Sequence, residues 1–155
     1  MTLYTTAKGN ILSSQAKAVV NTVNTQGVMG AGLALQFKTT YPSYFKDYQQ
    51  RCSTREVRIG HCTSYKLPSG QLIISFPSKD HWRNPSEYTY IESGLISLKE
   101  LILEQELDSI AIPPLGCGLG GLHWPTVRQM IEQHLNNLPT TVYIHAPAGF
   151  SWLYC

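Results

Sequence analysis

The chain carries few charged residues and no long apolar run. Only 14% of its 155 residues are charged, 43% are hydrophobic, and the formal net charge is +2. This composition excludes a disordered tail or linker, and so small a positive charge does not by itself indicate a nucleic-acid partner. No apolar run approaches the roughly 20 residues that cross a bilayer, and no charged-then-apolar leader follows Met1. We therefore expect one globular domain over residues 1–155, located in the cytoplasm and not associated with a membrane.

Paired cysteines and metal-binding spacings are also missing. The four cysteines, Cys52, Cys62, Cys117 and Cys155, are scattered without a Cys-x-x-Cys pair, which argues against a zinc ribbon or a disulfide scaffold. The five histidines show no His-Glu-x-x-His spacing. We expect neither a metal nor another cofactor in the chemistry. Cys117 lies in a glycine-rich segment, and we interpret it as a small residue chosen for fit because no histidine adjoins it as a base.

Two glycine-rich segments each lie between a strand-like and a helix-like stretch. Residues 20–38 read VNTVNTQGVMGAGLALQFK, and residues 109–124 read SIAIPPLGCGLGGLHW. Glycines let a backbone approach a ligand closely, and the first N–H groups of a helix attract anions. The first segment also places the amides of Asn21 and Asn24 on one turn. One such loop is explained as a tight connection, whereas two loops suit a ligand with two phosphates.

Neither segment matches the standard nucleotide-binding loops. A Gly-Lys-Ser/Thr triplet is missing, which excludes a Walker P-loop. After Gly30-Ala31-Gly32 the chain continues with Leu33-Ala34-Leu35, so the third glycine of the dinucleotide-binding fingerprint is missing as well. The phosphates are therefore expected to be held in another way.

Strand-like and helix-like segments alternate along the chain. Strands are predicted at 3–6, 18–23, 60–67, 71–76, 108–112 and 140–145, and helices at 32–39, 42–51, 86–106 and 125–135. This alternation predicts an α/β fold, a three-layer α/β/α domain with a mixed, largely parallel central sheet. Ligands of such sheets bind beyond the carboxyl ends of the strands, where both glycine-rich segments are expected to lie.

Four motifs follow one another along the chain: Gly9-Asn10-Ile11-Leu12, Val20-Asn21-Thr22-Val23-Asn24, Gly30-Ala31-Gly32-Leu33-Ala34 and Pro113-Pro114-Leu115-Gly116-Cys117-Gly118. In this order they resemble a macrodomain, a family that binds ADP-ribose, and the similarity covers nearly the whole chain. Within the family, residues 21–25, 27–30, 76–83 and 118–124 resemble the macrodomains of DarG-type antitoxins. The resemblance thus implies an enzyme that removes ADP-ribose from thymine bases in DNA.

The resemblance implies that the diphosphate of ADP-ribose lies between residues 27–32 and 116–121. Asn10 stands where many macrodomains have an aspartate that reads the adenine amino group, and its amide oxygen can still accept that hydrogen bond without charge assistance. The implied ADP-ribose-binding residues are Gly9, Asn10, Ile11, Asn24, Thr25, Gly27, Val28, Met29, Gly30, Gly32, Pro114, Leu115, Gly116, Cys117, Gly118, Leu119, Gly120, Gly121 and Leu122.

Lys79 matches the catalytic lysine of the family's glycohydrolase branch, which acts at the anomeric carbon of the distal ribose. It acts either as an amine nucleophile or as a cation that stabilises charge, and both roles stay open. The alternative is a solvated loop lysine. The resemblance implies that Asn21 orients the ribose and the lysine. Asp80 is expected to point to the opposite face, as an adjacent residue on an extended segment does.

A related branch, which removes ADP-ribose from glutamate, pairs its lysine with an aspartate in the second glycine-rich segment. At that place this chain has Gly118-Leu119-Gly120, without a carboxylate. We therefore favour a mechanism with the lysine alone or with a water. Such a mechanism favours a good leaving group, such as the imide nitrogen of thymine.

His81-Trp82-Arg83 is the predicted DNA contact. Trp82 is expected to stack on an unpaired base while His81 and Arg83 meet the flanking phosphates, and the alternative is that Trp82 packs as core. Trp124 is interpreted as packing. Further basic residues that could extend this contact into a basic path for the DNA are Lys8, Arg51, Arg55, Arg58 and Lys66.

Three function classes remain. The first is a hydrolase of ADP-ribosylated single-stranded DNA, which we favour because the chain carries the lysine segment besides the glycine-rich segments. The others are a hydrolase of ADP-ribosylated protein with a glutamate-linked ester, and a non-catalytic ADP-ribose reader. The resemblance further implies a DarT-type ADP-ribosyltransferase toxin as a partner, and we expect a monomer. DarG-type proteins carry a further domain that engages the toxin, and whether this chain stands alone or belongs to a longer protein stays open.

Overall fold

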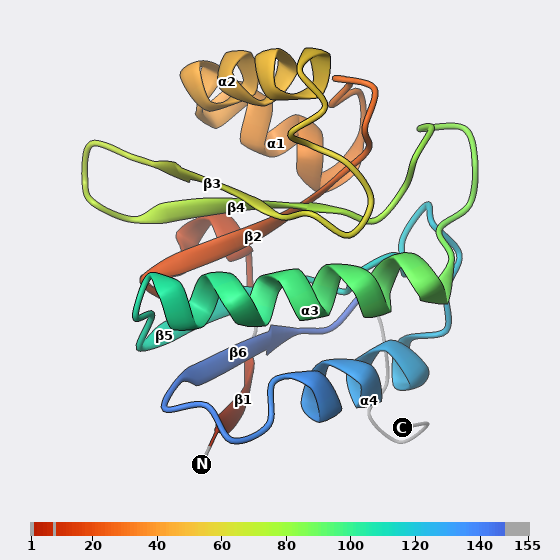
Figure 1. Ribbon diagram of the computed structural model, residues 1–155. Helices are drawn as coiled ribbons and strands as arrows, with labels where there is room; N and C mark the ends of the chain where they lie inside the picture. Colours follow the sequence, from red (N-terminus) through yellow and green to blue (C-terminus); the bar gives the residue numbers. More distant parts are fainter. Residues whose placement is uncertain (1, 8, 148–155) are drawn as a thin grey trace.

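The computed structural model describes residues 2–7 and 9–147 and shows one six-stranded sheet with helices on both faces (Figure 1). The strand order is β1-β6-β5-β2-β4-β3, and every neighbouring pair is parallel except β3 with β4. The strands are β1 (Leu3–Ala7), β2 (Ala18–Val23), β3 (Thr63–Lys66), β4 (Leu72–Pro77), β5 (Ser109–Ile112) and β6 (Thr141–His145). The helices are η1 (Ile11–Ser13), α1 (Gly32–Thr40), α2 (Pro42–Ser53), α3 (Tyr88–Glu104) and α4 (Trp124–His134). The predicted three-layer fold with a mixed, largely parallel sheet is confirmed.

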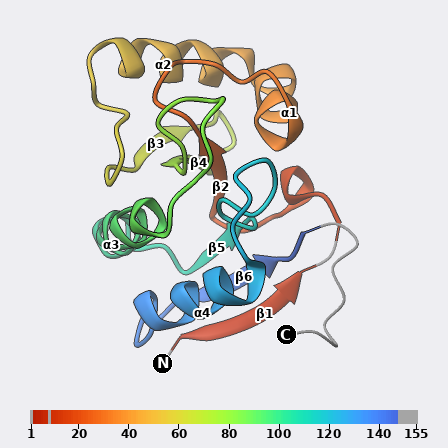
Figure 2. The ribbon, with the colours of Figure 1, turned by 90° about the vertical axis from the view of Figure 1, so that its right-hand side faces the viewer.

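The two faces of the sheet are covered by different helices. Ala18 and Val20 of β2 pack in the cluster that contains the apolar residues of α3 and α4, whereas Val19 and Val23 pack with residues of α1 and α2. Successive side chains of a strand point to opposite faces, so β2 has a core on each side. Figure 2 shows α3 and α1 on opposite sides of the sheet. This alternation also determines the face toward which the Asn21 side chain points.

Three connections gather at the carboxyl edge of the sheet, on the right of Figure 1 and facing the viewer in Figure 2. Residues 24–31 link β2 to α1, residues 78–87 link β4 to α3, and residues 113–123 link β5 to α4. We call them the first glycine loop, the lysine loop and the second glycine loop. Because β5, β2 and β4 are adjacent in the sheet, the three loops are neighbours as well.

The longest predicted helix is shorter than the sequence indicated. Residues 86–106 were expected to be helical, but α3 spans Tyr88–Glu104. Glu87 is extended, with φ −127° and ψ 148°, and Glu106 has a φ of 51°, so the backbone leaves the helix on both sides. Within the described residues, the structure contains no helix with the length and apolar character that a membrane crossing requires.

Candidate functional site

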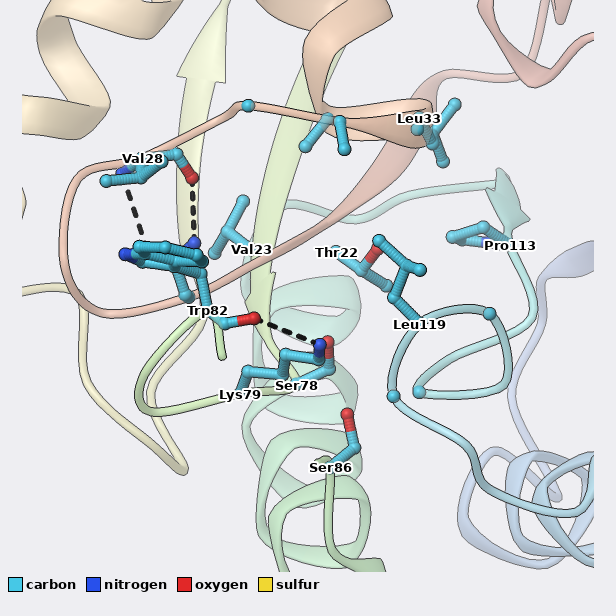
Figure 3. A pocket seen from close by; sticks show the side chains of 18 of the residues that line it. Thr22, Val23, Val28, Leu33, Ser78, Lys79, Trp82, Ser86, Pro113 and Leu119 are labelled. Carbon is cyan, nitrogen blue, oxygen red and sulfur yellow. Dashed lines mark hydrogen bonds between the residues drawn. The ribbon is translucent and has the colours of Figure 1, made fainter. Parts of the chain in front are cut away.

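A cavity of about 600 Å³ opens at the carboxyl edge of the sheet, which is within the size range of small-molecule sites. The end of β2, both glycine loops and the lysine loop line it (Figure 3). Lys79 is the one charged side chain among the described residues that line the cavity. The site is therefore positively charged and lacks a lining carboxylate.

Helix α1 begins at this cavity and adds to its attraction for anions. Gly32 and Leu33, its first residues, line the cavity, and the N-cap residue Ala31 provides no side-chain cap. The first backbone N–H groups of the nine-residue helix therefore have no partner within the helix and lie at the positive end of its dipole. This geometry fits an anionic ligand such as a diphosphate.

Asn24 organises the first glycine loop. Its Oδ1 accepts hydrogen bonds from the N–H groups of Gln26 (2.9 Å) and Val28 (3.4 Å), and its Nδ2 donates to the carbonyl of Val28 (2.7 Å). Tyr48 of α2 donates its hydroxyl to the carbonyl of Asn24 (2.8 Å) and lies 3.0 Å from Oδ1. The loop is thus shaped before a ligand arrives, and a side chain of α2 holds it.

The second glycine loop is organised by its own backbone. The N–H of Leu122 donates to the carbonyl of Gly116 (2.9 Å), and the N–H of Gly121 donates to the carbonyl of Gly118 (3.1 Å). Gly116 and Gly121 have φ values of 70° and 79°, in the region that favours glycine. A Cβ on Gly120 would lie 2.5 Å from the carbonyl oxygen of Gly116. Positions 116 and 121 therefore require glycine for its conformation, and position 120 requires it because no space is left for a Cβ.

The lysine loop is attached to both glycine loops. Thr25 of the first loop donates its backbone N–H to the carbonyl of Asp80 (3.1 Å) and its hydroxyl to the Asp80 carboxylate (2.6 Å). At the other end, the N–H of Ser86 donates to the carbonyl of Gly120 in the second loop (3.1 Å). Lys79 directly precedes the first of these attachments, and its own N–H donates to the carbonyl of Val23 at the end of β2 (3.4 Å).

The half-buried Lys79 side chain lies at the cavity wall. Its Nζ donates a hydrogen bond to the carbonyl of Trp82 (3.3 Å), which Figure 3 shows beside the cavity. A contact of 3.3 Å with a neutral acceptor leaves the other two donors of the ammonium group for a ligand. Lys79 therefore lines the cavity, and its catalytic role stays a prediction.

Asn21 lies on β2 and not on the turn with Asn24, where we expected it. Its side chain is fully buried and does not line the cavity, so its expected role in orienting the ribose and the lysine stays a prediction. Its Nδ2 lies 3.2 Å from the Tyr44 hydroxyl and 3.9 Å from the Met29 sulfur. Strand alternation explains this, because residue 21 shares the face of Val19 and therefore points toward α2.

Several other predicted ligand contacts do not line this cavity either. Ile11, Met29 and Leu115 are buried in the two cores. The remaining members of this group lie in the glycine loops but outside the lining: Thr25, Gly27, Cys117, Gly121 and Leu122. The predicted residues that do line the cavity are Asn24, Val28, Gly30, Gly32, Pro114, Gly116, Gly118, Leu119 and Gly120, together with Lys79 and Trp82.

The sequence did not single out as ligand contacts several residues that line the cavity: Thr22, Val23, Ala31, Leu33, Ala34, Ser78, Ser86 and Pro113. Most of them lie next to a predicted residue and are apolar or small, so no chemical pattern marks them. Ser86 is different, because it lies seven positions after Lys79 at the far end of the same loop. No spacing in the sequence marks it either, and only the folded lysine loop brings it to the cavity.

Gly9 and Asn10 line a second cavity of about 340 Å³ at the ends of β1 and β6. The Oδ1 of Asn10 accepts the N–H of Leu12 (3.0 Å) and so caps η1, while its Nδ2 donates to Gln36 of α1 (3.1 Å). An amide oxygen has two lone pairs, so the expected contact with an adenine amino group uses the one that remains.

Trp82 lies at the rim of the main cavity, and the alternative that it packs as core is wrong. The side chain is 44% exposed. His81 stacks on its ring at 5.2 Å between centroids, and the Arg83 guanidinium lies 4.6 Å from the ring centroid. Trp124, in contrast, is buried in the core, as expected. The cluster of residues 81–83 thus presents an aromatic face and two basic groups beside the cavity.

The further basic residues do not line the cavity. Arg51 forms ion pairs with Asp47 (2.9 Å) and Glu56 (3.6 Å) on α2 and the turn after it. Arg55, Arg58 and Lys66 lie on the surface away from the cavity lining, and Lys8 lies outside the described residues.

Cys117 is not poised as a nucleophile. Burial raises the pKa of its thiol to about 12, and its Sγ donates to the carbonyl of Leu115 (3.4 Å). The thiol is therefore neutral at physiological pH, which supports the interpretation of a residue chosen for fit. In residues 2–7 and 9–147, no group of three His, Cys, Asp or Glu side chains is arranged to hold a metal ion.

Comparison with known proteins adds a family and close relatives. The family model described as "Macro domain" matches residues 20–131. A curated DNA ADP-ribosyl glycohydrolase of Mycobacterium tuberculosis is 44% identical over 155 residues, which cover 96% of this chain and 44% of that protein. The chain spans less than half the length of the curated DNA ADP-ribosyl glycohydrolases that it matches.

Solved structures give the same result. The macrodomain of Thermus aquaticus DarG is 43% identical with a TM-score of 0.87, over 95% of this chain and 99% of that chain. Thermosipho africanus DarTG in complex with ADP-ribose is 33% identical with a TM-score of 0.91, over 96% of this chain and 43% of that chain. The similarity therefore extends over nearly the whole described fold.

Proposed function

Because this chain belongs to the macro domain family, we propose that it is an ADP-ribosyl glycohydrolase that removes ADP-ribose from thymidine bases of single-stranded DNA. The observation that carries the proposal is the position of Lys79. It is the only charged group that the described residues contribute to the lining of a cavity walled by both glycine loops. The 44% identity to curated DNA ADP-ribosyl glycohydrolases supports the same assignment.

The diphosphate of ADP-ribose would lie against the N-terminus of α1 and the glycine loops. The exposed N–H groups of these elements supply hydrogen bonds and positive potential without adding a charged side chain. Asn24 and Val28 shape the first loop for this contact, and Gly116, Gly118 and Gly120 let the second loop approach closely. The adenine would extend toward Asn10 in the second cavity.

Lys79 would act at the anomeric carbon of the distal ribose. Hydrolysis breaks the bond from this carbon to the thymine imide nitrogen, a water oxygen takes the place of the nitrogen, and a proton ends on the base. No carboxylate among the described residues lines the cavity, and the Asp80 carboxylate is bound to Thr25. A leaving group that tolerates negative charge, such as an imide, fits a site with a lysine and no carboxylate base.

His81, Trp82 and Arg83 would contact the DNA around the modified base. An exposed indole at the rim of the cavity provides a stacking surface for a nucleobase, and the basic neighbours provide contacts for phosphates. Asn21 would orient the ribose and Lys79, with its own amide held by Tyr44 and Met29. We further propose that residues 1–155 form one macrodomain that works as a monomer and reverses the modification made by a DarT-type toxin, consistent with the likeness to DarTG.

The test uses two substrates in parallel: a single-stranded oligonucleotide with ADP-ribose on thymine, and a protein with glutamate-linked ADP-ribose. We expect release of ADP-ribose and of the intact oligonucleotide, followed by mass, and a much lower rate on the protein. Trp82→Ala is expected to lower the rate on DNA about tenfold or more, as one lost base–aromatic stack does, and to leave the affinity for free ADP-ribose unchanged. Release only from the protein would move the assignment to a protein hydrolase, and binding without release from either would leave a reader.

A further inference from the structure

Ser86 carries a buried hydroxyl without a hydrogen-bond partner. The residue is 4% exposed, and its Oγ has no partner among the described residues, yet it lines the main cavity. Figure 3 shows the hydroxyl directed from the start of α3 toward the space beside Lys79. A buried hydroxyl left unpaired destabilises the fold, so such a group calls for an explanation.

The backbone around Ser86 is fixed, so its hydroxyl has a defined position. The N–H of Ser86 donates to the carbonyl of Gly120 (3.1 Å), and an added Cβ on Gly120 would lie within 2.3 Å of the Ser86 Oγ. The hydroxyl therefore lies directly against the second glycine loop, on the side of the cavity that also carries Lys79. The N-terminus of α1 lies on the opposite side in Figure 3.

Neither helix capping nor a general property of buried serines accounts for the unpaired hydroxyl. Helix α3 begins at Tyr88 and its N-cap is Glu87, so Ser86 precedes the cap and makes no capping hydrogen bond. Two other buried serines are satisfied: Ser75 lies 2.6 Å from the Tyr44 hydroxyl, and Ser97 accepts the N–H of Cys62 (2.9 Å). The unpaired state of Ser86 is thus not a general feature of serines in this core.

We infer that the Ser86 hydroxyl binds a hydroxyl group of the ribose on which Lys79 acts, at the reacting end of ADP-ribose. The inference rests on the proposed function, and it assigns the sugar rather than the diphosphate because Ser86 and Lys79 line the cavity from the same loop, across from Leu33 of α1 in Figure 3. A ligand hydroxyl can both donate and accept, so it satisfies a serine whichever way the serine proton points.

The test compares Ser86→Ala with the wild-type protein by titration with ADP-ribose and with ADP, which lacks this ribose. We expect Ser86→Ala to lower the affinity for ADP-ribose about tenfold, the equivalent of one hydrogen bond, and to leave the affinity for ADP unchanged. The midpoint of thermal unfolding without ligand should stay the same or rise, because the variant no longer buries an unpaired hydroxyl. Ser97→Ala is the matched control, and it should lower that midpoint and leave both affinities unchanged.

Two results overturn the inference. An equal loss of affinity for ADP and ADP-ribose would place the hydroxyl at the diphosphate, and a lower unfolding midpoint with unchanged affinities would make Ser86 a packing residue. Failure of the proposed function is detected separately, in the release assay on the DNA and protein substrates, because a protein hydrolase or a reader would still bind ADP-ribose.

Discussion

The two glycine loops face the same cavity but are held in place by different means. Side chains from α2 hold the first loop, through Tyr48 to Asn24 and through the Gln49 amide to the carbonyl of Gly27 (3.2 Å). The second loop is held by backbone hydrogen bonds and by close packing of Gly120 on Ser86. Its tip, Leu119, is 80% exposed.

The two loops are therefore expected to respond to different substitutions. A hydrogen-bonded loop weakens in steps as single bonds are removed, because each bond contributes about 0.5–1.5 kcal/mol. A loop in which glycines pack closely against their neighbours tolerates no added side chain, because the backbone must shift to make room for the Cβ. An added Cβ on Gly27 would meet no atom closer than 3.8 Å, so only its positive φ demands glycine there.

Among changes within the two glycine loops, the largest effect is expected from Gly120→Ala. The new methyl group would lie 2.5 Å from the carbonyl oxygen of Gly116 and within 2.3 Å of the Ser86 Oγ, so the second loop must shift. Overpacking of this kind costs about 1–3 kcal/mol, which lowers the unfolding midpoint by about 2–12 °C, and displacement of the loop should lower ADP-ribose affinity by tenfold or more. Calorimetry and titration measure both.

Gly118→Ala is the control for stability. An added Cβ there would meet no atom within 4 Å, and the φ of Gly118 is not in the left-handed region. Its unfolding midpoint should match the wild-type value. If Gly120→Ala and Gly118→Ala were equally stable, the second loop would not depend on close packing.

A smaller loss is expected from Tyr48→Phe. The change removes the hydroxyl that donates to the carbonyl of Asn24, while the ring stays in the core. We expect a loss of about 1–2 kcal/mol in the free energy of unfolding and a several-fold weaker affinity for ADP-ribose, since the first loop becomes less ordered. Chemical denaturation measures the free energy of unfolding, and titration measures the affinity for ADP-ribose.

Tyr41→Phe provides the comparison for Tyr48→Phe. The hydroxyl of Tyr41 makes no hydrogen bond among the residues that the structure describes. Its loss should therefore change neither the free energy of unfolding nor the affinity for ADP-ribose by more than the experimental error. Equal effects of the two variants would show that the first loop does not depend on the Tyr48 hydroxyl.

Thr25→Val is expected to act on turnover rather than on binding. It removes the hydroxyl that links the first loop to the Asp80 carboxylate, one position after Lys79. Because this bond is exposed, we expect only a two- to fivefold lower kcat with an unchanged affinity for ADP-ribose. Thr39→Val, which removes an exposed hydroxyl bond to Leu35 on α1, is the matched control and should leave kcat unchanged.

Cys117→Ser should have the smallest effect. Burial raises the pKa of the Cys117 thiol to about 12, so the protonated thiol dominates throughout the range from pH 6 to 9. A serine hydroxyl can still donate to the carbonyl of Leu115. The pH profile of kcat/KM should therefore superimpose on that of the wild-type protein, and a lost alkaline limb would instead reveal a catalytic thiolate.

The sequence predicted the fold well because its signals are local and periodic. Buried strands such as 18–23 and the apolar repeat of Ile91, Leu95, Leu98 and Ile102 each indicate one element without knowledge of the others. The order of strands and helices then restricts the sheet to a few arrangements. The predicted ends of α3 were two residues too far out on each side, because the helix ends where Glu87 and Glu106 leave the helical conformation.

The site was predicted less completely because side-chain direction depends on tertiary structure. Asn21 has the chemistry of a ligand contact, yet strand alternation turns it toward Tyr44. Ser86 has no distinctive spacing, and only the packing of α3 against the second loop brings it to the cavity. Lys79 and Trp82 were identified because they lie in one continuous segment that the resemblance covers.

The most direct test of the account compares the wild-type protein with Lys79→Ala in two assays. One is the titration with ADP-ribose, and the other is single-turnover release of ADP-ribose from thymine-modified single-stranded DNA. We expect the variant to bind ADP-ribose within about threefold of the wild type, while release slows by at least about a hundredfold. Release at the wild-type rate by Lys79→Ala would contradict the account, because the only charged group that the described residues place in the cavity lining would then have no part in the chemistry.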